Sequence, residues 1–250
     1  MPRVARPSSS ASRGDGSRRG RASVTQGVRP STRVLVIEDH TLLAESLEIA
    51  LSRDGYDVRR LSLPEIGGSL ATLKSAALRI NARIVLLDLD LGRFGDATPL
   101  ISPLARAGAN VVVVTASDER GRWGECARAG ARKVISKSRP MQEILSVVRR
   151  LAQGLTVMPP EELESLLEAW RRERMLTEDM RRRLEMLTAR EKQVLGHLLE
   201  GHTVRDIARS SVVSEATVRT QVKSILSKLE VSSQLAAVGM ARHARWQPPG

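Results

Sequence analysis

Three short runs of purely apolar residues constrain the fold more than any other feature of this 250-residue chain. They are Val34–Ile37, Ile84–Leu87 and Val111–Val114, and longer stretches with helical spacing lie between them. Strands without a polar face are typical of a parallel sheet that helices cover on both sides. Two weaker candidates, residues 57–61 and 133–136, bring the expected strands to five. The pattern predicts a doubly wound α/β domain.

Composition divides the rest of the chain. Residues 1–32 hold 7 Arg against one Asp and almost no large apolar side chains, so we expect a disordered basic tail, either a DNA-binding arm or a dispensable extension. The α/β domain occupies residues 33–154. Residues 155–186 predict a linker helix, whose apolar stripe packs on a neighbouring domain or forms a coiled-coil dimer seam. Residues 187–243 predict an all-helical domain, and residues 244–250 a disordered end.

Charge and cysteine content narrow the class of protein. The net charge of +12 favours a polyanionic partner. Cys126 is the only cysteine, which excludes intramolecular disulfides and cysteine-rich zinc sites and fits a reducing compartment. No apolar run approaches the roughly 18 residues of a membrane helix, and the N-terminus lacks the apolar segment of a signal peptide. We expect a cytoplasmic protein with no membrane partner.

Helix start signals organise the second domain. Thr188 and Glu191 have the spacing of a capping box, in which a hydroxyl and a carboxylate satisfy backbone donors at a helix start. Thr203 opens a short second helix, Ser214 caps a longer third one, and a final helix is expected from about Ser232. A short helix, a tight turn and a longer helix predict a helix-turn-helix unit.

The third of these helices carries the candidate DNA-binding residues. Its apolar stripe of Val218, Val222 and Ile225 should be buried. The outward residues expected to reach base edges in the major groove are Arg219, Thr220 and Lys223. The residues expected at phosphates are Thr217, Gln221 and Lys228. Because aromatic residues make up only 2% of the chain, double-stranded DNA is favoured over single strands.

Polar side chains follow the apolar runs of the first domain. Glu38 and Asp39 follow the first run, Asp88 the second, Thr115 the third, and Lys137 the weaker strand near residue 135. Parallel strands bind ligands at their carboxyl ends, so these groups should meet at one edge of the sheet. Three carboxylates repel one another unless a cation joins them, and oxygen ligands suit Mg²⁺.

These motifs carry a resemblance to a known family. The segments Val-Leu-Val-Ile-Glu38-Asp39-His, Val-Leu-Leu-Asp88-Leu-Asp, Val-Val-Val-Thr115-Ala and Ser-Lys137 resemble the receiver domain of two-component response regulators over residues 33–154. The resemblance implies a flavodoxin-like fold in which Asp88 accepts a phosphoryl group from a sensor histidine kinase. Lys137 would contact that group, and the Thr115 hydroxyl would hydrogen-bond it and shift on activation. The implied Mg²⁺ ligands are Glu38, Asp39, Asp88 and the main-chain carbonyl of Asp90.

Departures from the family pattern leave two alternatives. The chain has Gly92 rather than proline in the loop after Asp88, and Val134 stands where an aromatic switch residue is expected. The receiver could therefore be a dimerisation scaffold that works without phosphorylation. Asp88-Leu-Asp90 also resembles the first motif of haloacid-dehalogenase-type phosphatases. Those enzymes place their metal-binding acids after the lysine, where this chain has no Gly-Asp-x-x-x-Asp pattern, and its acid pair Glu38-Asp39 lies before the motif instead.

The C-terminal motifs carry a second resemblance. Leu187-Thr-Ala-Arg-Glu191, Gly201, Asp206-Ile-Ala208 and the run from Val213 to Leu229 resemble the LuxR-type (NarL-type) DNA-binding domain. Together the two resemblances imply a transcription factor that binds DNA as a homodimer. It would not be an enzyme apart from catalysing its own phosphorylation and dephosphorylation.

Overall fold

The computed structural model describes residues 32–63 and 68–248. The tail expected to be disordered therefore lies, except for its last residue, outside the described residues. The elements of the α/β domain are β1 (Arg33–Ile37), α1 (Thr41–Arg53), β2 (Asp57–Arg60), α2 (Leu70–Ile80), β3 (Ile84–Leu87), the 3-10 turn η1 (Gly92–Phe94), α3 (Thr98–Arg106), β4 (Asn110–Thr115), α4 (Arg120–Ala129), β5 (Lys133–Ser136) and α5 (Met141–Ala152).

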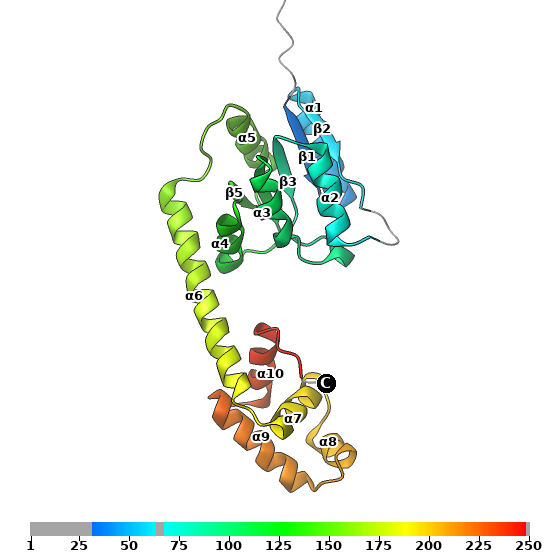
Figure 1. Ribbon diagram of the computed structural model, residues 1–250, viewed down its shortest axis with the longest axis vertical. Helices are drawn as coiled ribbons and strands as arrows, with labels where there is room; N and C mark the ends of the chain where they lie inside the picture. The colour runs from blue at the N-terminus through cyan, green and yellow to red at the C-terminus, as the bar shows by residue number, and fades with distance from the viewer. Residues whose placement is uncertain (1–31, 64–67, 249–250) are drawn as a thin grey trace, which may run out of the picture. The chain divides into compact units, whose positions relative to one another are not determined.

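The five strands form one parallel sheet in the order β2-β1-β3-β4-β5 (Figure 1). This confirms the predicted doubly wound architecture. Residues Val34 to Ile37 pair in register with Ile84 to Leu87, so β1 and β3 end side by side. The strand order reverses between these two strands, and a crevice for ligands lies at such a point, outside the carboxyl ends of the strands.

Each face of the sheet is covered by helices. Leu47 and Leu51 of α1 pack with Val148 of α5 on one face. On the other face α2, α3 and α4 bury side chains that include Leu73, Ile101 and Cys126. The Cys126 side chain is fully buried, and burial raises the pKa of its thiol to about 12. Burial on both faces explains why the central strands are apolar throughout.

The predicted linker helix is present as α6 (Pro160–Glu185). Near its start Leu166 is buried against Trp123 and Ala127. A Cβ atom at Gly124 would collide with the carbonyl oxygen of Leu166 and would lie 2.7 Å from Cβ of Trp170. Glycine therefore lets the backbones of α4 and α6 approach closely. The apolar stripe of α6 packs on a helix of the α/β domain, which is one of the two alternatives expected for it.

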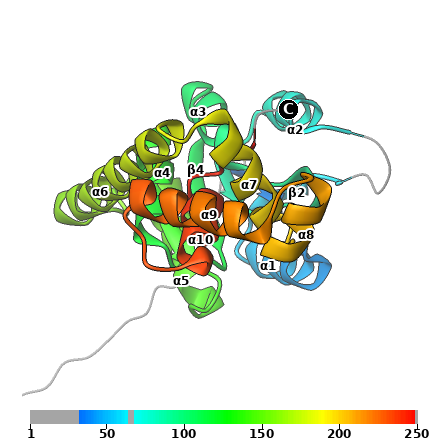
Figure 2. The same cartoon turned by 90° about the horizontal axis from the view of Figure 1, so that it is seen from below.

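The C-terminal domain consists of four short helices joined to the end of α6. They are α7 (Ala189–Leu199), α8 (Val204–Ser210), α9 (Glu215–Leu229) and α10 (Gln234–His243). Figure 2 shows α7, α8 and α10 around α9, and all four bury apolar side chains in one core, which also includes Leu184 of α6. The expected capping box of Thr188 with Glu191 is present, and a second one, Thr203 with Asp206, begins the short helix α8.

This domain extends further than the sequence indicated. Ala244 is buried and Trp246 packs against the same core. The expectation of a disordered end from residue 244 onward is therefore wrong for residues 244–246, which belong to the folded domain. The segment lacks a helical apolar stripe, and for that reason its packing gave no periodic signal. In the part of the chain that the structure describes, no helix combines the length and the apolar character needed to cross a membrane.

Candidate functional site

Lys137 joins the two most deeply buried carboxylates at the carboxyl edge of the sheet. Its Nζ atom lies 2.7 Å from Oδ2 of Asp88 and 2.8 Å from Oε1 of Glu38. The two carboxylate side chains are 2% and 3% exposed. Both follow buried parallel strands whose register brings their ends together, so the local fold itself produces the cluster.

Burial and charge act in opposite directions on this pair. Burial raises the pKa of the Asp88 carboxyl, repulsion from Glu38 raises it further, and the hydrogen bond from Lys137 opposes the shift. Burial would lower the pKa of Lys137, but its hydrogen bonds to Asp88 and Glu38 outweigh this, and the pKa lies above its ordinary value. Lys137 therefore stays protonated beside carboxylates that lack the full screening of water.

A third carboxylate completes a group that suits a hard cation. Asp39 joins Glu38 and Asp88 in a cluster whose candidate ligand atoms all lie within 4.8 Å of one another. The same cluster contains His40, whose Nδ1 lies 3.0 Å from Oε1 of Glu38 and 2.9 Å from Oδ1 of Asp39. Three carboxylates fit the oxygen preference of Mg²⁺. His40 was not among the predicted site residues, although its place directly after the acidic pair could have marked it.

Thr115 lies beside Lys137, as its place at the end of β4 predicts. Its backbone carbonyl accepts a hydrogen bond from the Lys137 amide at 2.7 Å. The Thr115 side chain is fully buried, and its hydroxyl accepts a bond of 3.2 Å from the Ser117 amide. The structure therefore brings the predicted alcohol, amine and carboxylates to one edge of the sheet.

The Asp90 side chain turns away from the cluster toward α4. Arg122 donates to its two oxygens at 2.9 and 3.2 Å and also contacts Oδ1 of Asp96 at 3.3 Å. Hydrogen bonding to Asp90 raises the pKa of Arg122. The Asp90 amide donates to Oδ1 of Asp88 at 3.3 Å. Arg122 ties the loop after β3 to α4, and sequence reasoning missed it because its partners are 32 and 26 residues away.

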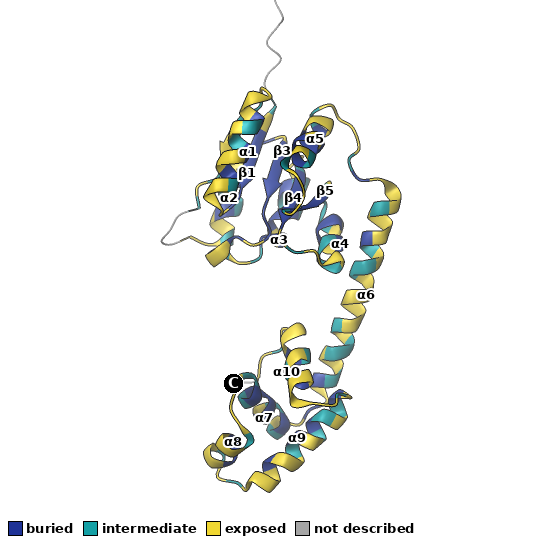
Figure 3. Cartoon of the chain, turned by 180° about the vertical axis from the view of Figure 1, so that it is seen from behind, coloured by how far each residue is buried: buried dark blue, intermediate teal, exposed yellow. Residues whose placement is uncertain are grey.

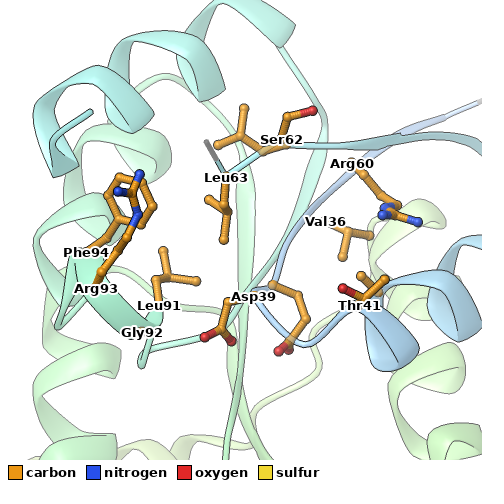
Figure 4. A pocket seen from close by; sticks show the side chains of 13 residues that line it. Val36, Asp39, Thr41, Arg60, Ser62, Leu63, Leu91, Gly92, Arg93 and Phe94 are labelled. Carbon is orange, nitrogen blue, oxygen red and sulfur yellow. The ribbon is translucent and has the colours of Figure 1, made fainter. Parts of the chain in front are cut away.

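Gly92 allows this loop to approach the acidic pair. Its φ of +52° is in the left-handed region, and a Cβ atom there would lie 3.0 Å from Oδ2 of Asp39. Figure 4 shows Asp39 beside the turn that Leu91 and Gly92 form. The acidic group borders a pocket of about 560 Å³ with an apolar wall that includes Phe94. Gly92, which stands in the loop where the resemblance predicts a proline, therefore has a steric role next to Asp39, a predicted metal ligand.

In the second domain, α9 has the amphipathic form that the sequence predicts. Val218, Val222 and Ile225 are buried, and the Ser214 hydroxyl accepts a bond of 3.1 Å from the Thr217 amide at the helix start. The outer side of the helix is exposed (Figure 3). The predicted base-reading residues on that side are Arg219, Thr220 and Lys223.

The predicted phosphate-contacting residues occupy three different environments. Thr217 is exposed, and its hydroxyl is 2.9 Å from that of Ser214. Gln221 is half-buried, and among the described residues its Oε1 is a buried atom without a hydrogen-bond partner. Lys228 donates to Oε2 of Glu191 at 2.7 Å. A phosphate contact by Lys228 stays a prediction and requires that its ammonium leave, or share, this carboxylate.

Comparisons with known proteins match both domains. The family model described as a response regulator receiver domain matches residues 34–149, and the model of bacterial regulatory proteins of the luxR family matches residues 185–241. The nitrate/nitrite response regulator protein NarP of Escherichia coli is 28% identical over 82% of this chain and 91% of its own length. The response regulator protein VraR of Staphylococcus aureus is 28% identical over 82% of this chain and 94% of its length.

A structure of the RcsB response regulator of Salmonella typhimurium covers 85% of this chain and 100% of its own at 18% identity, with a TM-score of 0.47. The two family models together match both the carboxylate-lined sheet edge and the capped helices described above. The chain therefore belongs to the DNA-binding response regulators of two-component systems that join a receiver domain to a LuxR-type helix-turn-helix domain.

Proposed function

We propose that Asp88 is the phosphoryl acceptor of this regulator and that a sensor histidine kinase is the donor. The carboxylate of Asp88 attacks phosphorus, a P–O bond forms, and the P–N bond to the kinase imidazole breaks. The observation that carries the proposal is Lys137, whose ammonium lies between the buried carboxylates of Asp88 and Glu38. Such a cation can neutralise the oxygens of the transferred group without further rearrangement.

The oxygen ligands of the site support a bound Mg²⁺. Glu38, Asp39 and Asp88 would hold it together with the main-chain carbonyl of Asp90. When bound, Mg²⁺ neutralises charge on the phosphoryl oxygens. Gly92 keeps room for the Asp39 carboxylate, and Thr115 would supply a hydroxyl to the phosphorylated site.

The acceptor assignment is tested with acetyl phosphate as the donor. Asp88→Asn should abolish the added phosphoryl mass in intact-protein mass spectrometry, because the nucleophile is lost while the shape is kept. Asp118→Asn is the matched control, since this exposed carboxylate lies outside the cluster. Equal incorporation in wild type and Asp88→Asn contradicts the assignment. Sustained hydrolysis of a small phosphate ester would instead favour a phosphatase.

We propose that α9 reads duplex DNA through Arg219, Thr220 and Lys223, with Thr217, Gln221 and Lys228 at phosphates. An operator is first selected from random duplexes. Lys223→Ala should then weaken binding to that operator by about 1–3 kcal/mol, because one base contact is lost. Lys192→Ala on α7 removes the same charge from another helix and should keep the operator preference. An unchanged operator affinity for Lys223→Ala contradicts this orientation of α9.

The active form is proposed to be a cytoplasmic homodimer. Met175 and Leu176 on α6 are 69% and 56% exposed, and an apolar surface of this kind is available to a second copy of the chain. Sedimentation with and without acetyl phosphate should show dimers that increase on phosphorylation.

The scaffold alternative is favoured by Val134, which is buried in the core where the family expects a switch residue. It predicts equal dimerisation and equal DNA affinity under both conditions.

A further inference from the structure

Two histidines and a glutamate meet at the turn after α7, far along the sequence from the phosphorylation site. The atoms involved are Nδ1 of His197, Nδ1 of His202 and Oε2 of Glu200. The two imidazole nitrogens are 3.3 Å apart, and the carboxylate oxygen lies 3.5 Å from the first and 3.4 Å from the second. The group is one of two candidate metal-binding clusters among the described residues.

The backbone of this turn holds the histidines together. The His202 amide donates to the His197 carbonyl at 3.0 Å, and the Gly201 amide donates to the Leu198 carbonyl at 3.1 Å. Gly201 has a φ of +87°. These bonds form a Schellman motif, in which the side chains at the positions of His197 and His202 usually make an apolar contact. Here both positions carry imidazoles, so the cap of α7 sets the distance between two metal-ligating groups.

The three distances match those expected around a tetrahedral ion. Zinc binds histidine nitrogen and carboxylate oxygen at about 2.0–2.2 Å. In a regular tetrahedron with such bonds, neighbouring ligand atoms are separated by about 3.3–3.6 Å. All three measured separations, 3.3, 3.4 and 3.5 Å, are within or at the limits of that range. An ion can therefore contact all three atoms without movement of the backbone.

We propose that His197, Glu200 and His202 bind a zinc-class divalent cation, with water as the fourth ligand. Imidazole nitrogens favour such transition metals over Mg²⁺. The site is accessible, because the side chains of Glu200 and His202 are 60% and 50% exposed. A bound ion joins the end of α7 to the residue before Thr203, which caps α8. The ion would stabilise the turn between the first two helices of the DNA-binding domain.

Isothermal titration of the full-length protein with ZnCl₂ tests the proposal, in excess MgCl₂ to occupy the receiver cluster. Wild type should bind one Zn²⁺ through this site. His202→Ala and Glu200→Gln should each weaken that affinity at least tenfold, because even indirect partners of a metal contribute about 10- to 100-fold. His243→Ala is the matched control, since this histidine pairs with Glu173 outside the cluster. It should bind as wild type does.

Co²⁺ provides a second, spectroscopic readout that is independent of the calorimetric titration. The visible absorption of bound Co²⁺ should be present in wild type and in Asp39→Asn, whose receiver cluster lacks one carboxylate, and absent in His202→Ala. Circular dichroism checks that each variant is folded. Zn²⁺ affinity and Co²⁺ absorption that are the same in folded His202→Ala as in wild type overturn the proposal. So does a wild-type isotherm that vanishes in Asp39→Asn, because the receiver cluster is then the binding site.

Discussion

Glu191 connects the first and third helices of the DNA-binding domain, and Glu191→Gln tests this connection. One of its oxygens accepts from the Thr188 amide and from Lys228, both at 2.7 Å. The other accepts from the Ser224 hydroxyl at 2.7 Å. Glutamine keeps the size of the side chain but removes its charge, and its NH₂ group would face one of these donors. The substitution therefore removes the ion pair and leaves donors facing each other.

The pKa of Glu191 gives the magnitude. Burial alone would raise it, but hydrogen bonds from Lys228, Ser224 and Thr188 outweigh burial and lower the pKa from 4.5 to about 2. A shift of this size corresponds to roughly 3 kcal/mol of stability at neutral pH. Because the Lys228 side chain is 34% exposed, water screens part of that interaction, and we expect a loss of about 2–3 kcal/mol. The folded-state pKa is depressed, so this stabilisation is complete above pH 4.5 and is lost as the pH falls toward 2.

Native-state hydrogen exchange measured by mass spectrometry resolves the two domains of the full chain. In Glu191→Gln the opening free energy of peptides from residues 187–248 should fall by about 2–3 kcal/mol at pH 7. Peptides from the receiver should exchange as in wild type. The difference between variant and wild type should narrow as the pH falls from about 5 toward 2, because in this range the Glu191 carboxyl of the unfolded wild-type chain is protonated while that of the folded chain still resists protonation.

Glu215→Gln is the matched control on the same domain. Glu215 pairs with Arg219 at 3.3 Å, and that arginine side chain is 72% exposed. An exposed pair of this spacing contributes about 0.3–0.5 kcal/mol. If Glu191→Gln costs no more than Glu215→Gln, the buried network adds nothing and the reasoning is refuted. A loss of opening free energy that does not change with pH would refute the assignment of this stability to the charge of Glu191.

Two glycine substitutions test close approaches in the receiver. Gly92→Ala should weaken Mg²⁺ binding measured by calorimetry, because the added methyl lies 3.0 Å from Oδ2 of Asp39. Gly108 also has a positive φ, +90°, but nothing lies within 4 Å of an added Cβ atom. Gly108→Ala therefore introduces backbone strain without a steric contact and should keep Mg²⁺ affinity; equal losses would contradict the steric explanation. Gly124→Val should separate α4 from α6 and expose α6 to limited proteolysis, because its side chain would collide with Leu166. Gly239→Val, in a helix with open space around it, should stay resistant, and equal cleavage would show that the close contact is not what protects α6.

The central sheet could be predicted from sequence because burial on two faces leaves a pattern in every residue. Residues Ile84–Leu87 are all buried, and no helix or half-exposed strand requires four adjacent apolar side chains. The edge strand β2 was a weaker prediction, since its last two residues are exposed arginines. The carboxylate site followed from the same reasoning, because parallel strands place their carboxyl ends at one edge.

Long-range ion pairs between helices could not be predicted in this way. Lys228 and Glu191 are 37 residues apart, and their contact depends on how two helices cross, which periodicity does not report. Local spacing, by contrast, does carry a signal for the close contact between α4 and α6. Gly121 and Gly124 are three residues apart, a spacing that places them on one face of α4. A Cβ atom added at either glycine would lie less than 3.0 Å from an atom of α6.

The burial of Cys126 has a practical consequence for measuring motion in this regulator. Its thiol is inaccessible in the receiver core, and its raised pKa keeps it protonated at neutral pH, so thiol-directed reagents find no reactive native group. Because the chain has no second cysteine, one cysteine introduced on the surface would carry a spin label or fluorophore alone. The wild-type sequence already serves as the background that site-directed labelling normally has to engineer.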